Sequence, residues 1–179
     1  MRKTKRSQNR TKAPTARGPA IREMELDDLP GVYRLGERLF TPDKQPNLYR
    51  TWDEYELASF FTSDGDFCLV AESGDRIVGF AIGTLIEKRR SAWKYGYLIW
   101  VGVSPRFKRH RLGSRLVERL TERFIKHGAR IMMVDTQKSN WEALQFFKKQ
   151  GIGNDIGHVY LSRNLSSHPD YLKKNEVRR

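Results

Sequence analysis

The segment Val101–Arg115 constrains the fold of this 179-residue chain more than any other. It begins with apolar residues typical of a strand, passes through Ser104 and Pro105 into a run of cationic residues, and then follows a helical pattern. A strand that leads directly into a helix presents the helix N-terminus and its unpaired backbone N–H groups at one edge of a sheet. The segment therefore predicts an α/β domain with a loop suited to a phosphate-bearing ligand.

The helix after this loop has a single apolar face. Its apolar residues recur at helical spacing over residues 112–127 and are Leu112, Leu116, Val117, Leu120 and Phe124. Gly128 marks the helix end, and the apolar run over residues 130–136 predicts a buried parallel strand. Together with a strand over residues 95–103, this helix forms a β–α–β crossover, which is expected to be right-handed.

The rest of the pattern adds strands and helices around this crossover. Strands are predicted at residues 21–23, 67–72, 76–87 and 158–165, and helices at residues 29–40, 52–61 and 139–151. Ser139 and Glu142 form a capping box at the start of the last of these helices. The sequence therefore predicts one α/β domain over residues 20–166, with a mixed, mostly antiparallel central sheet, one parallel β–α–β crossover and flanking helices.

Charge is concentrated at the ends of the chain. Residues 1–19 hold seven lysines and arginines and no acid, which is more than half of the formal net charge of +13. Because these residues offer almost nothing that could pack, we expect a disordered basic arm. Such an arm suits weak contact with nucleic acid or the ribosome, or it remains in solvent. Residues 167–179 form a smaller basic tail.

Composition argues against several other classes of protein. Cys68 is the single cysteine, so no internal disulfide forms, and its apolar neighbours predict a buried thiol. The four histidines show no spacing that suggests a metal site. No apolar run is long enough to span a membrane, and we expect a cytoplasmic protein. Trp93, Trp100 and Trp141 follow strand and helix periods, which favours core packing over base stacking.

Two motifs stand at a spacing suited to form opposite walls of one cleft. The first is Val103-x-Pro105 with the basic loop and Leu112-Gly-Ser-x-Leu116, and the second is Asn140-x-x-Ala143-x-x-x-Phe147-x-x-x-Gly151. Together with the order of the elements, they resemble the GNAT superfamily of acyl-CoA N-acyltransferases over about residues 20–165. The resemblance implies a GNAT fold, acetyl-CoA as cosubstrate and no metal.

The resemblance also implies how coenzyme A binds. The family's phosphate loop, Gln/Arg-x-x-Gly-x-Gly/Ala, falls on residues 108–113, where Arg111 replaces the first glycine. We expect a right-handed backbone at Arg111, which would tolerate this change. If a positive φ is required there instead, Arg111 costs about 1–2 kcal/mol and phosphate binding is weakened or lost. The pantetheine would use backbone groups exposed where the two parallel strands splay apart, and also Asn140. The coenzyme-binding residues implied are Val101, Val103, Lys108, Arg109, His110, Arg111, Leu112, Gly113, Ser114, Asn140 and Phe147.

Amine acylation needs a neutral amine, a stabilised oxyanion and a proton for the departing thiolate. A backbone N–H near Trp100 or Val101 is expected to hold the oxyanion. The family often protonates the thiolate with a tyrosine in the second motif, where this chain has Phe147 or, as the alternative position, Phe146. Phenylalanine cannot donate a proton, so either another tyrosine or solvent supplies it. Tyr160 is the first substitute and Tyr97 the second.

The candidate general bases are Glu87 and Asp135, each at the end of a predicted strand. The resemblance implies transfer of an acetyl group from acetyl-CoA to a primary amine by direct attack, with a protein N-terminus or lysine as the first acceptor. A small-molecule amine is an alternative acceptor. A non-catalytic coenzyme A-binding or nucleic-acid-binding module is the alternative from another class. Nothing in the sequence specifies the oligomeric state, although dimers are common in the family.

Overall fold

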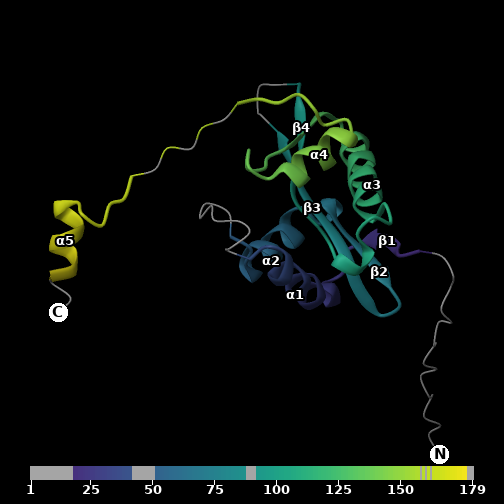
Figure 1. The fold of residues 1–179 in the computed structure, drawn as a ribbon, viewed down its shortest axis with the longest axis horizontal. Helices are drawn as coiled ribbons and strands as arrows, with labels where there is room; N and C mark the ends of the chain where they lie inside the picture. The colour runs from purple at the N-terminus through teal and green to yellow at the C-terminus, as the bar shows by residue number, and fades with distance from the viewer. Residues whose placement is uncertain are drawn as a thin grey trace, which may run out of the picture.

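The fold is built on a mixed sheet (Figure 1). A computed structural model describes residues 18–41, 51–87, 92–157, 159, 161 and 163–176. Within these residues the strands pair in sequence order: β1 (Ala20–Glu23), β2 (Cys68–Ser73), β3 (Arg76–Glu87), β4 (Lys94–Val103) and β5 (Ala129–Val134). The first three pairings are antiparallel and β4 pairs with β5 in parallel, through the crossover helix α3 (Leu112–Lys126). The predicted fold class is confirmed.

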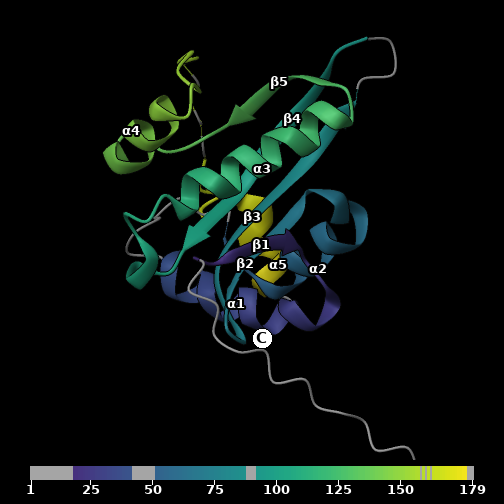
Figure 2. The same ribbon diagram turned by 90° about the vertical axis from the view of Figure 1, so that its right-hand side faces the viewer.

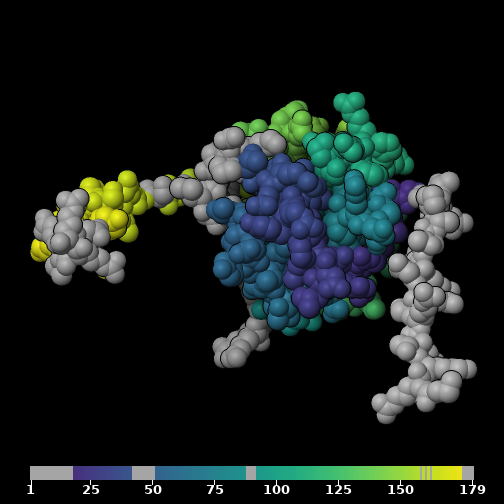
Figure 3. Space-filling view, turned by 90° about the horizontal axis from the view of Figure 1, so that it is seen from below, coloured from purple at the N-terminus to yellow at the C-terminus, as the bar shows by residue number. Residues whose placement is uncertain are grey.

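Helices cover both faces of this sheet, as Figure 2 shows. On one face, α1 (Leu29–Leu39) and α2 (Glu54–Ser63) pack against Val70, Phe80 and Ile82. These two helices, coloured purple to blue, occupy the centre of the face seen in Figure 3. On the other face, α3 packs against a second core cluster. The predicted burial of Cys68 is confirmed, and this burial raises the pKa of the thiol to about 12.

The close approach of α3 to the sheet depends on two glycines. A Cβ atom at Gly96 would lie 2.3 Å from Cγ of Phe124, and one at Gly83 would lie 2.6 Å from Cζ of the same ring. The Phe124 side chain is fully buried and fills this space. Because protein interiors are close-packed, α3 can approach the sheet this closely only if residues 83 and 96 have no side chain.

Two predictions in the C-terminal third are wrong in detail. The strand β5 is not buried, because it lies at the edge of the sheet, and Ile131 and Met133 are partly exposed. The helix α4 (Trp141–Lys149) is capped by Asn140 rather than Ser139, since the Asn140 side chain accepts a hydrogen bond from the backbone N–H of Ala143 at 3.2 Å. Capping by asparagine satisfies the same orphan donors that a capping box would.

The predicted strand over residues 158–165 is also wrong as far as the structure describes it. Residues 159, 161 and 163–165 are not in a strand, and Val159 and Leu161 are exposed. Alternating apolar residues specify a strand only where another strand supplies backbone partners, and none of the described strands pairs with this segment. Part of the predicted basic tail forms α5 (Pro169–Glu176), whereas residues 1–17 of the predicted arm lie outside the described residues.

The tryptophans do not share one environment. Trp100 is buried in the core, as predicted, but Trp93 and Trp141 are 47% and 68% exposed. Trp93 lies just before β4, where the guanidinium of Arg130 stacks over its ring at 5.7 Å. Trp141 is the first residue of α4. The expectation of core packing is therefore wrong for these two residues, because both stand at element ends rather than under a second layer.

Candidate functional site

The strands β4 and β5 separate part-way along their length. Their parallel pairing runs from Lys94 and Ala129 to Leu98 and Val134, where it ends. Beyond that point β4 continues to Val103 while still paired with β3 on its other side. The predicted splay is present, and it begins after Leu98 rather than at the end of the strand. The edge of β4 that follows Leu98 has no partner strand among the described residues, so a ligand can use its backbone groups.

A β-bulge marks the start of this splay. Gly83 pairs with Leu98 and Ile82 pairs with Trp100, which leaves Ile99 as the extra residue of β4. The bulge changes the direction of the side chains, because Leu98 packs in the core on the α3 side and Trp100 packs in the core beside α1. Two residues apart on a regular strand would face the same way.

The bulge brings a carboxylate of α2 to β4. With its ring turned toward α1 and α2, Trp100 donates from its indole Nε1–H to Oε2 of Glu56 at 3.3 Å. Glu56 is half-buried on α2, and Trp100 lies two residues past the last pairing between β4 and β5. The carboxylate of Glu56 therefore lies on the α2 side of the splayed part of β4. Sequence reasoning missed Glu56, since only the tertiary packing of α2 relates it to the strand.

The loop between β4 and α3 contains two residues in the left-handed region. Arg109 has a φ of 69° and Arg111 a φ of 56° with a ψ of 12°. The expectation of a right-handed backbone at Arg111 is wrong. For residues other than glycine this conformation costs roughly 1–2 kcal/mol each. Such strain clusters at functional sites, where the surrounding structure over-determines it.

This strained loop exposes a run of backbone donors. The N–H groups of residues 109–114 make no hydrogen bond within the described chain, and the first helical bond of α3 is from the N–H of Arg115 to the carbonyl of Arg111 at 3.0 Å. Arg106, Lys108, Arg109 and Arg111 form no ion pair with any described carboxylate. Unpaired donors at the N-terminus of a 15-residue helix, surrounded by uncompensated cations, are features that favour the binding of an anion.

The helix α4 packs against the start of α3, next to the loop. A Cβ atom at Gly113 would lie 3.4 Å from the ring of Phe146 and 3.6 Å from Cγ2 of Val103, so these side chains crowd the helix entry. Ser114 Oγ accepts a hydrogen bond from Gln150 Nε2 at 3.0 Å, which ties the first turn of α3 to the end of α4. Phe147 is buried in the core, and it is its neighbour Phe146 that lies toward Gly113.

The remaining coenzyme candidates lie along the same edge. Val101 and Val103 belong to the splayed part of β4, with side chains packed toward α3. Leu112 is buried and anchors the start of α3. The ring of His110 is held by a 3.0 Å hydrogen bond between Nδ1 and the carbonyl of Lys108. Asn140 precedes α4, with its side-chain oxygen engaged in the cap.

The structure brings two of the acid–base candidates together. Tyr97 donates a hydrogen bond of 2.5 Å from its hydroxyl to Oδ1 of Asp135. Tyr97 is in the last paired stretch of β4, and Asp135 is the first residue after β5, so the pair lies where the strands separate. Glu87 is instead at the opposite end of the β3–β4 pair, where Lys94 Nζ binds its Oε1 at 2.5 Å. Tyr160 lies outside the described residues.

Two other expectations concern metals and membranes. Among the described residues, no group of three or more histidine, cysteine, aspartate or glutamate side chains is arranged to hold a metal ion. No helix in that part of the chain is long and apolar enough to cross a membrane.

Comparison with known proteins identifies the family. The profile of the Acetyltransferase (GNAT) family matches residues 29–152, which includes β4, the strained loop, α3, β5 and α4. The chain belongs to the GNAT acetyltransferase family. This confirms the resemblance seen in the sequence, and the match covers both motifs that carried it.

Two curated relatives match over 118 residues at 23% identity: the N-alpha-acetyltransferase 30 proteins of Homo sapiens and Mus musculus. The match covers 66% of this chain and 31% of each relative, so the chain spans about a third of their length. Among solved structures, an aminoglycoside acetyltransferase from an uncultured soil metagenomic sample aligns with a TM-score of 0.65 at 20% identity, over 82% of this chain and 96% of that one. The NatC complex bound to a Gag peptide and CoA aligns with a TM-score of 0.63 at 13% identity, over 87% and 93%.

Proposed function

We propose that this chain transfers an acetyl group from acetyl-CoA to the primary amine of a peptide or protein. The observation that carries the proposal is the loop over residues 109–114, whose free backbone donors and uncompensated cations stand at the splayed end of β4. A diphosphate fits this loop, and the amides of a pantetheine arm fit the unpaired edge of β4. Family membership supports the same reaction class.

The acyl group would lie where Tyr97 and Asp135 meet. Direct attack moves one proton from the amine nitrogen to the thiolate sulfur, while the N–C bond forms and the C–S bond breaks. We infer that Asp135 accepts the amine proton and that Tyr97 gives its hydroxyl proton to the sulfur. Proton transfer across their 2.5 Å hydrogen bond then restores both groups. A backbone N–H just past the Ile99 bulge would hold the oxyanion.

The acceptor is proposed from the relatives that match by sequence. Both are named as N-alpha-acetyltransferases, and the NatC structure includes a bound peptide. A small-molecule amine is the second candidate, because a solved neighbour at 20% identity and a TM-score of 0.64 is an aminoglycoside acetyltransferase in complex with sisomicin. A panel of peptides with free N-termini, lysine-containing peptides with blocked N-termini, and aminoglycosides separates these acceptors. Turnover on either group of peptides, without turnover on the aminoglycosides, would support the proposal.

The first experiment is a calorimetric titration of acetyl-CoA into the intact chain. Gly113→Glu places a carboxylate among the loop donors and should abolish binding. Gly113→Ala is the matched control, since its Cβ would lie 3.4 Å from the Phe146 ring and 3.6 Å from Cγ2 of Val103, both ordinary contact distances, and it should retain binding within a few-fold. Micromolar affinity in the wild type and in Gly113→Ala, lost in Gly113→Glu, would support the site. Equal affinity in all three proteins, or no binding to the wild type, would contradict it.

The proton-transfer proposal has its own test. Tyr97→Phe and Asp135→Asn should each lower kcat by about 10²-fold or more while the acetyl-CoA Kd is unchanged. The double variant should be no slower than the worse single variant, because both residues serve one transfer. Glu87→Gln is the control, because Glu87 lies at the other end of the strands and should leave kcat unaltered. Full activity in Tyr97→Phe would rule out the relay.

A further inference from the structure

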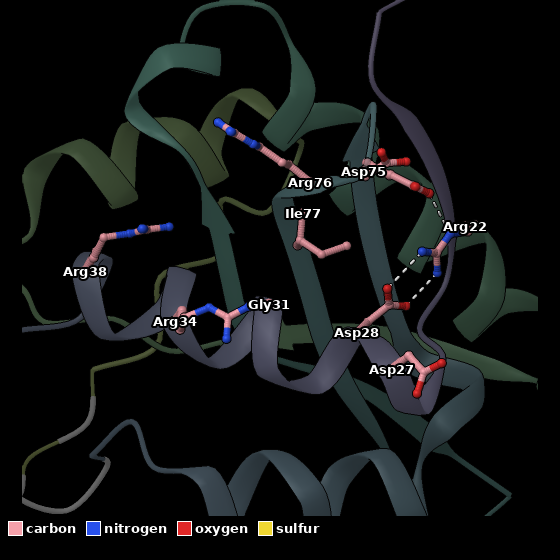
Figure 4. A pocket seen from close by; sticks show the side chains of 10 residues that line it. Arg22, Asp27, Asp28, Gly31, Arg34, Arg38, Asp75, Arg76 and Ile77 are labelled. Atoms are coloured by element: carbon pink, nitrogen blue, oxygen red, sulfur yellow. Dashed lines mark hydrogen bonds and ion pairs between the residues drawn. The ribbon is translucent and has the colours of Figure 1, made fainter. Parts of the chain in front are cut away.

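A depression lies on the α1 face of the sheet, apart from the splayed strands (Figure 4). Its volume is about 290 Å³, and residues of α1, the start of β3 and the neighbouring ends of β1 and β2 line it. No residue of β4, β5, α3 or the strained loop contributes to its wall. The volume suits a ligand the size of an amino acid, well below that of coenzyme A.

One wall of this cavity is acidic and fixed in place. Arg22 binds both carboxylate oxygens of Asp28, at 2.6 and 2.8 Å, and its Nε binds Glu72 at 3.0 Å. Asp28 also accepts a hydrogen bond from the backbone N–H of Glu25 at 2.8 Å, and it is buried. One guanidinium therefore serves two carboxylates, which leaves this rigid network with a net negative charge.

Two further carboxylates add to the same wall. Asp27, beside the network, and Asp75, in the β2–β3 turn, line the cavity and have no hydrogen bond or ion pair in the described chain. In Figure 4 both lie on the side where Arg22 and Asp28 meet. A cation bound at this end would lie beside the carboxylates of Asp27 and Asp75, which form no ion pair with any described lysine or arginine.

The opposite wall is basic and unpaired. Arg34 and Arg38 stand one turn apart on α1, and Arg76 begins β3. None of the three has a hydrogen bond or an ion pair within the described residues. Like charges four residues apart on a helix repel each other, so this arrangement is not explained by the stability of α1. Figure 4 shows Arg34 and Arg38 on the side away from Asp27 and Asp75, and the side chain of Arg76 extending away from its neighbour Asp75.

A short apolar floor separates the two walls. Ile77 and Gly31 lie between them in Figure 4, and a Cβ atom at Gly31 would approach Cγ1 of Ile77 to 3.0 Å. The missing side chain at residue 31 keeps the floor open. The cavity thus presents cations at one end, carboxylates at the other and a methylene-sized apolar surface in the middle.

We propose that this cavity binds a small zwitterion, with its carboxylate on Arg34, Arg38 and Arg76 and its ammonium on Asp27 and Asp75. Bidentate pairing with guanidinium makes a carboxylate the matching anion. An ω-amino acid of the form ⁺H₃N–(CH₂)ₙ–COO⁻ has the required separation of charges for some value of n. A ligand with only one charge satisfies one wall and leaves the other unchanged, so it should bind much more weakly.

The test uses the intact chain and does not depend on acetyl transfer. Amino acids from glycine to 6-aminohexanoate are titrated into ¹⁵N-labelled protein, with the backbone amide of Gly31 as the local reporter. One chain length should give saturable shifts at Gly31, at least ten-fold tighter than butyrate, butylamine or inorganic phosphate. Shifts that are equal for phosphate or butyrate would reduce the cavity to a simple anion site and overturn the proposal, as would no saturable shift with any amino acid.

Substitutions separate the cavity from general charge effects. The double variant Arg34→Gln/Arg38→Gln should weaken binding at least ten-fold while amide shifts elsewhere report an intact fold. Arg119→Gln is the matched control, because Arg119 is an exposed arginine of α3, on the other face of the sheet. An equal loss in the control would show that net charge, and not this cavity, determines binding. Retained binding in the double variant would also contradict the proposal.

Discussion

Replacing Arg111 with glycine should stabilise the protein, although it changes a residue of the proposed active site. Arg111 has a φ of 56°, which costs roughly 1–2 kcal/mol for a residue with a Cβ atom. Glycine adopts this conformation freely but loses about 0.5–1 kcal/mol more backbone entropy on folding. The net gain in the free energy of unfolding is about 0.5–1 kcal/mol, or about 1–4 °C in Tm for a chain of this size.

Lys108 supplies the matched control in the same loop. Its φ is −59° with a ψ of 150°, an ordinary extended conformation. Lys108→Gly removes the same unit of charge but relieves no strain, so it should destabilise by about 0.5–1 kcal/mol through backbone entropy alone. The two variants should therefore differ by about 1–2 kcal/mol and have opposite signs.

Equilibrium urea unfolding, followed by tryptophan fluorescence and far-UV circular dichroism, measures both changes. The slope of free energy against urea should be the same in all three proteins, since neither variant alters the buried surface. If the two glycine variants shift the midpoint of urea unfolding in the same direction and by the same amount, the backbone at Arg111 is not strained. Its left-handed conformation would then give no support to a functional role of the loop.

Other predictions follow from packing and charge. Gly96→Ala should lower the free energy of unfolding by about 3 kcal/mol in the same urea assay, because its Cβ would lie 2.3 Å from the Phe124 ring; a loss below 1 kcal/mol would mean that α3 shifts freely. Hydrogen bonding to Arg22 lowers the pKa of Asp28, so this pair stabilises the fold above the ordinary aspartate pKa, and that stability is lost as the pH falls through the lowered value. Asp28→Asn should therefore lower the free energy of unfolding by about 2 kcal/mol at pH 7. It should also reduce the loss of stability that acid causes in the wild type. An unchanged dependence of stability on pH would refute the contribution of the Arg22–Asp28 pair. The Cys68 thiol, with its pKa raised to about 12 by burial, should react with a thiol reagent at pH 8 only in urea, and fast labelling of the native protein would contradict that burial.

Local sequence patterns predicted much of the site. The apolar stripe of α3, the cationic loop and the break before Leu112 all depend on residues within one turn or one strand of each other. Sequence spacing also placed Tyr97 and Asp135 among the candidates, although it could not show that they share a hydrogen bond. Glu87 stays a prediction, and its carboxylate pairs with Lys94 across the hairpin, away from the point where β4 and β5 separate. Sequence reasoning failed at Arg111, because residue identity alone does not fix a φ angle that the loop imposes.

The sequence by itself determined the order of the elements from the first strand to the helix α4, and the sheet with its parallel crossover. These two properties follow from hydrophobic periods and turn residues, which act over a few neighbours. The family was indicated by the resemblance of the two motifs. Only the tertiary structure decided where β4 and β5 separate, since a bulge at Ile99 exists only in relation to β3. Tertiary structure likewise brought Glu56 to Trp100 and set the charged walls of the α1 cavity facing each other. Such contacts join residues that are far apart along the chain. These residues come together only when the helices pack on the sheet, and no local sequence pattern encodes that packing.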